Sequence, residues 1–285
     1  MNSADALRAV ASGIALALAA IPAAWAAGNT NSFYATLGAD YSSGTYGQSS
    51  STTIWDVPLS AGYDSRLWSF RVTLPYLHVS GPPNVIPGIG AIRNNNPIGR
   101  GLGRLLHGTG VTPPAQTVTS TSGTASGIGD VVAQATFHAI RDNASQFELD
   151  VTGRIEFGTA SANKGLGTGQ NDYGAEVNAY KGFGSAWTLF GGLGYTSLGS
   201  STYIQLRNVW SANAGVNYAM DASDSAGIFL FFQQRPSIYG YSRQEATFYY
   251  NHKINRTWAL QGYFLGGFAN GSPDYGLGAS ARYSF

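Results

Sequence analysis

The sequence predicts an all-β fold, a transmembrane antiparallel β-barrel of about twelve strands, and three observations support this prediction. Apolar and polar residues alternate with a period of two in many segments, which indicates strands with one apolar face. Only 11% of the residues are charged although 44% are hydrophobic, which is too little charge for the surface of a typical soluble domain. The mean hydropathy of −0.07 is too polar for a bundle of membrane helices.

Composition also excludes several functions. A net charge of +1 gives no electrostatic basis for binding nucleic acid. The absence of cysteine excludes disulfides and thiolate chemistry. The chain contains no H-E-x-x-H, P-loop or G-x-S-x-G motif, so we expect no catalytic residues, no metal and no cofactor.

Residues 1–26 are predicted to be a cleaved secretory signal peptide. Arg8 supplies positive charge, residues 9–21 form a short apolar core, and Ala24 and Ala26 give the small-residue spacing of a cleavage site. The alternative is a membrane anchor, but the apolar run is too short to span a bilayer comfortably. An exported chain of this composition is expected in the outer membrane of a Gram-negative bacterium.

The mature chain, residues 27–285, is predicted to form the barrel. The clearest alternation is in residues 147–157, where Glu148, Asp150, Arg154 and Glu156 share one face and the opposite face is apolar. The expected strands are 32–44, 51–63, 66–79, 127–141, 145–159, 171–182, 185–198, 206–220, 225–237, 241–253, 256–268 and 273–285.

The predicted connections alternate between tight turns and longer loops, and the longest loop is 80–126. Outer-membrane barrels have short periplasmic turns and longer external loops, so we expect 80–126 to be external. An even number of strands then returns both termini to the periplasm. Interfacial tryptophans are expected at the strand ends on the apolar face, and these are Trp55, Trp68, Trp187, Trp210 and Trp258.

Two kinds of motif resemble known outer-membrane proteins. The terminal Tyr283 and Phe285, two residues apart on one strand face, resemble the signature read by the barrel assembly machinery. Residues 70–76, 126–131 and 165–173 resemble, in order, a family of outer-membrane transporters named for the meta-pathway of phenol degradation. This resemblance implies import of small apolar or aromatic molecules.

We therefore predict an outer-membrane channel or transporter for small apolar or aromatic compounds, and not an enzyme. Its expected partners are outer-membrane lipid, lipopolysaccharide and the barrel assembly machinery. Two alternatives remain open, namely a non-transporting structural or adhesive barrel and an outer-membrane phospholipase. The phospholipase hypothesis depends on His78 and Ser80, which lie two apart on one strand face.

Strand parity directs a set of charged residues into the lumen: Asp40, Asp56, Arg71, Asp130, Glu148, Asp150, Arg154, Glu156, Glu176, Arg243, Glu245, Lys253 and Arg282. Six of these are candidates for a selective constriction, namely Arg71, Arg154, Glu156, Glu176, Arg243 and Glu245. The alternative is that opposite charges pair and fill a narrow lumen.

The long loop 80–126 contains basic residues and no acidic ones. Arg93, Arg100 and Arg104 are its candidate functional residues. A basic external loop is suited to anionic lipopolysaccharide or to folding inward to narrow the pore, and the alternative is a solvated loop.

The terminal aromatic residues give a first testable expectation. Deleting Phe285, or replacing Tyr283 and Phe285 by serine, should lower the amount of folded protein in the outer membrane, because recognition precedes barrel closure. Heat-modifiable electrophoretic mobility of membrane fractions measures this amount, and the purified variant should keep its stability in detergent. Normal surface levels of the Phe285 deletion would contradict the expectation.

Overall fold

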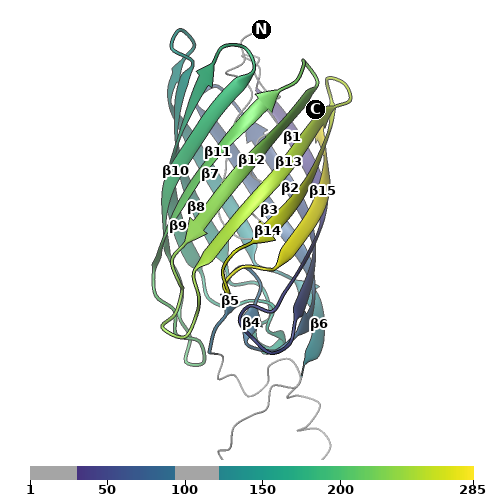
Figure 1. Cartoon of the computed structure of the whole chain (residues 1–285), viewed down its shortest axis with the longest axis vertical. Helices are drawn as coiled ribbons and strands as arrows, with labels where there is room; N and C mark the ends of the chain where they lie inside the picture. Colours follow the sequence, from purple (N-terminus) through teal and green to yellow (C-terminus); the bar gives the residue numbers. More distant parts are fainter. Residues whose placement is uncertain (1–30, 94–121) are drawn as a thin grey trace, which may run out of the picture.

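A computed structural model of the 285-residue chain describes residues 31–93 and 122–285 (Figure 1). The predicted signal peptide, 1–26, lies outside the described residues, as do Arg100 and Arg104. The described part is almost entirely β-structure, with one short 3₁₀ helix, Ala162–Lys164. Within it, no helix has both the length and the apolar character needed to cross a membrane.

Twelve antiparallel strands close into a barrel, as the alternation predicted. The sheet closes where β2 pairs with β3, and each neighbouring pair is antiparallel. The wall consists of β1 (Ser32–Gly44), β2 (Thr52–Asp64), β3 (Trp68–Gly81), β6 (Gly123–Ile128) with β7 (Val131–Asp142), β8 (Phe147–Phe157), β9 (Asp172–Phe183), β10 (Trp187–Ser197), β11 (Val209–Ala219), β12 (Asp224–Gln233), β13 (Arg243–Lys253), β14 (Trp258–Gly267) and β15 (Tyr275–Ser284).

The strand expected at 127–141 differs from the prediction, because it begins earlier and is divided into β6 and β7. Both parts pair with β3, and the break at Gly129 and Asp130 lies beside Pro75. Proline has no N–H to donate, so the ladder is interrupted there. The N–H of Gly129 still donates to the carbonyl of Pro75 at 2.9 Å, which holds the two parts in line.

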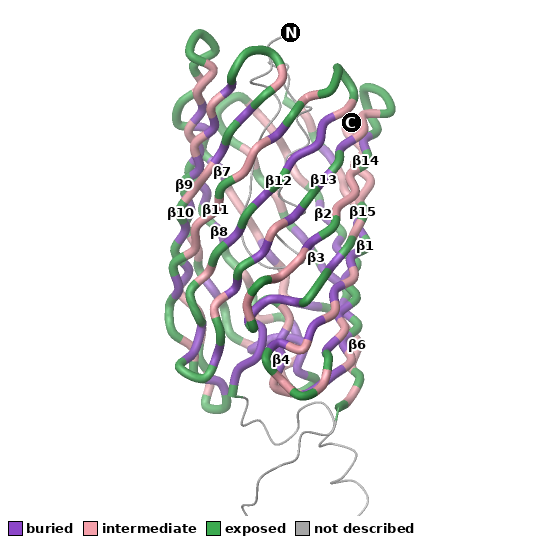
Figure 2. The backbone as a smooth tube through the Cα atoms, in the orientation of Figure 1, coloured by how far each residue is buried: buried purple, intermediate pink, exposed green. Residues whose placement is uncertain are grey.

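The two faces of the wall differ sharply in exposure (Figure 2). In β8, Val151 is 41% exposed while Asp150 is 1% exposed and Thr152 is 5% exposed. The exposed set is apolar and the buried set is polar, which is the reverse of a soluble protein. Alternating apolar-out and polar-in residues are the arrangement of a transmembrane barrel with its apolar face toward lipid.

Turns and loops separate to opposite ends of the barrel. Tight turns join β2 to β3, β7 to β8, β9 to β10, β11 to β12 and β13 to β14, and the remaining connections are longer. We call these ends the short-turn end and the long-loop end. The last strand finishes at the short-turn end, opposite β4 and β5 (Figure 1).

A small hairpin from the 80–126 connection packs inside the long-loop end. It consists of β4 (Val85–Ile86) and β5 (Gly90–Ala91), which pair with each other and not with the wall. Val85 is fully buried against Tyr46, and Ile86 is 1% exposed against Ile204. The described part of the long connection therefore narrows the lumen at this end.

The two-sided wall predicts a difference in chemical labelling. The chain has no cysteine, so Val151→Cys and Thr152→Cys each introduce a single thiol. In proteoliposomes the outward thiol at position 151 should be labelled about tenfold faster by a lipid-soluble maleimide than by a water-soluble one, because lipid covers it. The inward thiol at 152 should show no such preference for the lipid-soluble reagent. Equal preferences at the two positions would contradict the assignment of the faces.

Candidate functional site

Inward-facing aromatic rings lie across glycines of the neighbouring strands. A Cβ added at Gly215 would come within 2.3 Å of Cζ of Phe190, and one added at Gly227 would come within 2.3 Å of the hydroxyl of Tyr249. Each ring is directly paired with its glycine in the register, Phe190 with Gly215 and Tyr249 with Gly227. The missing side chains therefore let the rings lie flat against the wall and keep room in the lumen.

Five buried aromatic side chains form a cluster on one side of the lumen. They are Tyr180, Phe190, Phe229, Phe231 and Tyr249, and we call them the lumen aromatic cluster. The ring centroids of Phe190 and Phe229 are 6.2 Å apart, and those of Phe229 and Phe231 are 6.3 Å apart. The cluster is an apolar surface inside a barrel whose inner face is otherwise largely polar.

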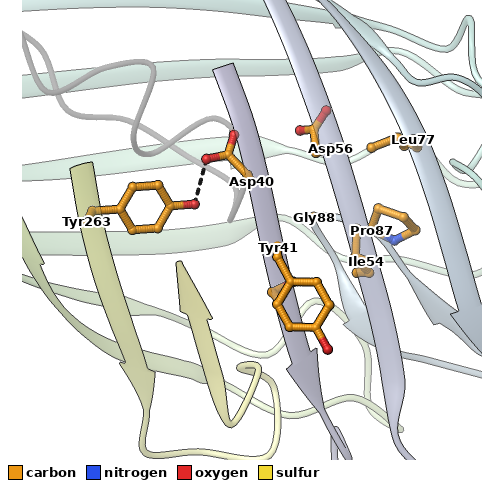
Figure 3. Close-up of a pocket in the computed structure, with 9 residues that line it drawn as sticks. Asp40, Tyr41, Ile54, Asp56, Leu77, Pro87, Gly88 and Tyr263 are labelled. Carbon is orange, nitrogen blue, oxygen red and sulfur yellow. Dashed lines mark hydrogen bonds between the residues drawn. The ribbon is translucent and has the colours of Figure 1, made fainter. Parts of the chain in front are cut away.

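Tyr263 connects this cluster to a pair of carboxylates. Its ring packs against the lumen aromatic cluster, and its hydroxyl donates to Oδ1 of Asp40 at 2.8 Å (Figure 3). Asp40 on β1 lies directly opposite Asp56 on β2, and both side chains are buried. A cavity of about 30 Å³ is lined by both aspartates, Tyr263 and Gly88.

Arg243 joins the inserted hairpin to the wall. Its guanidinium is 1% exposed and forms a forked ion pair with Glu245, with Nε to Oε1 at 3.0 Å and Nη2 to Oε2 at 2.9 Å. Nη1 also donates to the carbonyl of Gly88 at the tip of the hairpin, at 3.5 Å. Arg243 thus links the wall to the hairpin, and Glu245 fixes the position of its guanidinium.

The other charged candidates lie elsewhere in the wall. Nη1 of Arg154 is 2.9 Å from Oε2 of Glu156, and Glu176 accepts a hydrogen bond from Asn213 at 2.8 Å. Arg71 lies toward the short-turn end, where its Nε donates to the hydroxyl of Tyr34 at 2.9 Å.

The six candidates therefore form three separate groups and not one ring. Same-strand pairing neutralises two of the arginines locally, Arg154 with Glu156 and Arg243 with Glu245.

Three further candidates on or near the 80–126 connection have defined surroundings. Arg93 lies over the exposed ring of Tyr239, with Cζ 5.4 Å from the centroid. His78 is exposed on the outer face, and its Nδ1 is 2.7 Å from Oγ of Ser126. Ser80 instead accepts a hydrogen bond from Thr124 at 3.2 Å. The pairing of His78 with Ser80 that the phospholipase hypothesis required is not formed.

The aromatic candidates on the outer surface lie near strand ends. Trp55, Trp68, Trp187, Trp210 and Trp258 are 43–56% exposed and each is stacked on or tilted against a neighbouring ring. Tyr283 contacts the rings of Trp258 and Phe285, both with centroids 5.0 Å away. This arrangement leaves Phe285, at 77% exposure, accessible at the short-turn end.

Sequence reasoning missed two features of the lumen. Tyr180, Phe229 and Phe231 were not recognised as lumen residues, although strand parity directs all three inward. The pairing of Asp40 with Asp56 depends on the register of β1 and β2, which parity does not give. In the described ranges, no group of three or more His, Asp or Glu side chains is arranged to hold a metal ion.

No family model matches the chain, and no curated protein matches it. The fold is similar to that of solved outer-membrane barrels. An outer-membrane channel from Pseudomonas putida F1 superposes with a TM-score of 0.65 at 13% identity, over 93% of this chain and 99% of that one. The NanC porin gives a TM-score of 0.53 at 11% identity, over 87% and 98%. The chain thus has the fold of an outer-membrane barrel.

The Arg243 contacts predict a change in conductance. Arg243→Ala removes the donor to Gly88 and leaves Glu245 buried without its ion-pair partner, so the hairpin should lose its anchor and the single-channel conductance should rise about twofold or more. Arg154→Ala is the matched control, because it removes a similar same-strand ion pair, with Glu156 on β8. Equal conductance in the two variants would contradict the anchoring role.

Proposed function

We propose that this protein is an outer-membrane channel that admits small apolar or aromatic compounds along the aromatic side of its lumen. The observation that carries the proposal is the lumen aromatic cluster, five buried aromatic side chains on the inner face of a transmembrane barrel. A water-filled pore favours polar inner walls, whereas buried aromatic rings bind apolar solutes.

The inserted hairpin supports the same proposal. Val85, Ile86, Ala91 and Ile92 are each at most 3% exposed, so β4 and β5 fill space at the long-loop end. A narrow lumen with an apolar side suits solutes that shed their water, because hydrated solutes would lose hydrogen bonds on entry. We infer that the long-loop end faces the exterior and that the mature chain begins after the signal peptide.

A non-transporting structural barrel is the second candidate function. It is favoured by the local pairing of polar lumen side chains, since the Arg243–Glu245 ion pair and the His138–Asp150 contact are buried and fill the interior. Such a barrel would need no apolar surface inside the lumen. The lumen aromatic cluster favours the channel over this alternative, because phenylalanines that face the lumen do not contact lipid and so do not help to anchor the barrel in the membrane.

Uptake of a labelled neutral aromatic compound tests the proposal. In Gram-negative cells that express the protein, the double variant Phe190→Asn, Phe229→Asn should lower protein-dependent uptake of radiolabelled benzyl alcohol about tenfold, because it replaces the apolar surface with amides. Thr188→Asn is the control, since Thr188 faces the same lumen without belonging to the cluster.

Surface levels and heat-modifiable mobility of each variant confirm that the barrel has formed. Unchanged uptake in a correctly assembled double variant would contradict the proposal. Uptake that does not depend on the wild-type protein at all would favour the structural barrel.

A further inference from the structure

Asp56 is a buried carboxylate without hydrogen-bond donors. Its side chain is 2% exposed, and neither Oδ1 nor Oδ2 accepts a hydrogen bond from the residues that the structure describes. It lines the cavity shared with Asp40 and Tyr263 (Figure 3). An ionised carboxylate is unfavourable in such a place unless a cation or several donors compensate it.

Asp40, the neighbour of Asp56, makes an ionised Asp56 still less favourable. Asp40 is its direct partner across the β1–β2 ladder, and like charges directly opposite each other repel. Asp40 receives one hydrogen bond, from the hydroxyl of Tyr263 at 2.8 Å, which satisfies one acceptor and supplies no charge. The pair therefore presents a surplus of acceptors and of negative charge toward one cavity.

The other buried acids in the lumen differ from this pair. Glu245 receives two donors from Arg243, Glu176 receives one from Asn213, and Asp150 is 2.8 Å from His138. Each of those acids already has a donor in the wall. A ligand for Asp40 and Asp56 must bring both positive charge and N–H groups, as an ammonium ion does.

The surroundings indicate what the ammonium group is attached to. The cavity of about 30 Å³ has room for one group of the size of a water molecule. Tyr263 forms one side of it and also packs against the lumen aromatic cluster, so an apolar surface begins next to the acidic pair. Rings also attract cations through their faces.

We propose that Asp40 and Asp56 bind the ammonium group of a small aromatic amine, whose ring lies on Tyr263 and the adjoining lumen aromatic cluster. This inference rests on the proposed function and adds a substrate class to it. Amines would be admitted in preference to neutral compounds of the same shape, because only the ammonium group brings positive charge and three N–H donors to the acidic pair.

Gly278 keeps the site open on the β15 side. It is the register partner of both Asp40 and Tyr263. A Cβ added there would lie 2.0 Å from Oδ1 of Asp40 and 2.3 Å from Cε1 of Tyr263. The hydrogen bond between Tyr263 and Asp40 therefore passes directly over Gly278, where any residue with a Cβ would clash with both side chains.

Binding of two matched probes tests the proposal. Isothermal titration of the purified full-length barrel in detergent compares 2-phenylethylamine, which is protonated at pH 7, with neutral 2-phenylethanol. The wild-type protein should bind the amine about tenfold more tightly than the alcohol, which corresponds to about 1.4 kcal/mol. Asp56→Asn should reduce amine affinity to the level of the alcohol and leave alcohol affinity unchanged.

Asp172→Asn is the matched control, because it removes a buried carboxylate that already accepts a hydrogen bond, from the N–H of Gly199 at 2.7 Å. It should leave the binding of both probes unchanged. Amine affinity equal to that of the alcohol in the wild type, or unaffected by Asp56→Asn, would overturn the ammonium site. Methylammonium binding as tight as that of 2-phenylethylamine would overturn the role of the aromatic surface.

The outcomes also separate this inference from the proposed function. Binding of the alcohol without preference for the amine would remove the ammonium site and leave the aromatic channel intact. Failure of the barrel to bind either probe would count against both. Heat-modifiable mobility of Asp56→Asn shows whether the variant has folded, and Asp40→Asn provides a second variant of the same pair.

Discussion

Hydrocarbon offers no hydrogen-bond partner to a peptide group, and the closed wall of this protein satisfies that constraint. With β6 and β7 counted as one strand, each wall strand pairs with neighbours on both sides, and the β2–β3 ladder completes the circle. A closed antiparallel sheet satisfies its backbone groups without an edge. Because successive side chains of a strand point to opposite faces, the sequence of each strand then determines which residues face lipid and which face the lumen.

The chemical character of the lumen is set by the side chains that the wall strands direct inward. Aromatic rings occupy one side because glycines on adjacent strands let them lie flat, as Phe190 does over Gly215. Arginines pair with glutamates two residues along the same strand, as Arg243 does with Glu245. These ion pairs are neutral overall and occupy lumen volume. Asp40 and Asp56 differ from them, because two acidic side chains face each other without a basic partner among the described residues.

How far the sequence predicted this structure depends on whether a feature is local along the chain. Alternation is local, and the expected strand 32–44 coincides with β1 (Ser32–Gly44). Strand parity also directed Arg243, Asp40 and Asp56 inward correctly. The break between β6 and β7 was missed because its cause, Pro75, lies on the neighbouring strand β3.

The hairpin and the acidic pair required contacts that no local pattern gives. Residues 85–91 show no alternation, and their position depends on Tyr46 and Arg243, which are distant in sequence. Asp40 and Asp56 face each other only because the β1–β2 register aligns them. Register is set by pairing and turn geometry across the whole sheet, so composition and periodicity do not determine it.

In the proposed function, small aromatic solutes occupy the lumen of this barrel, against the lumen aromatic cluster. Anomalous diffraction from crystals soaked with 4-bromobenzyl alcohol tests this most directly, because bromine locates the solute without reference to any assay. We expect a bromine peak within contact distance of Phe190 or Phe229, inside the wall. Bromine found only on the outer, lipid-facing surface would contradict it.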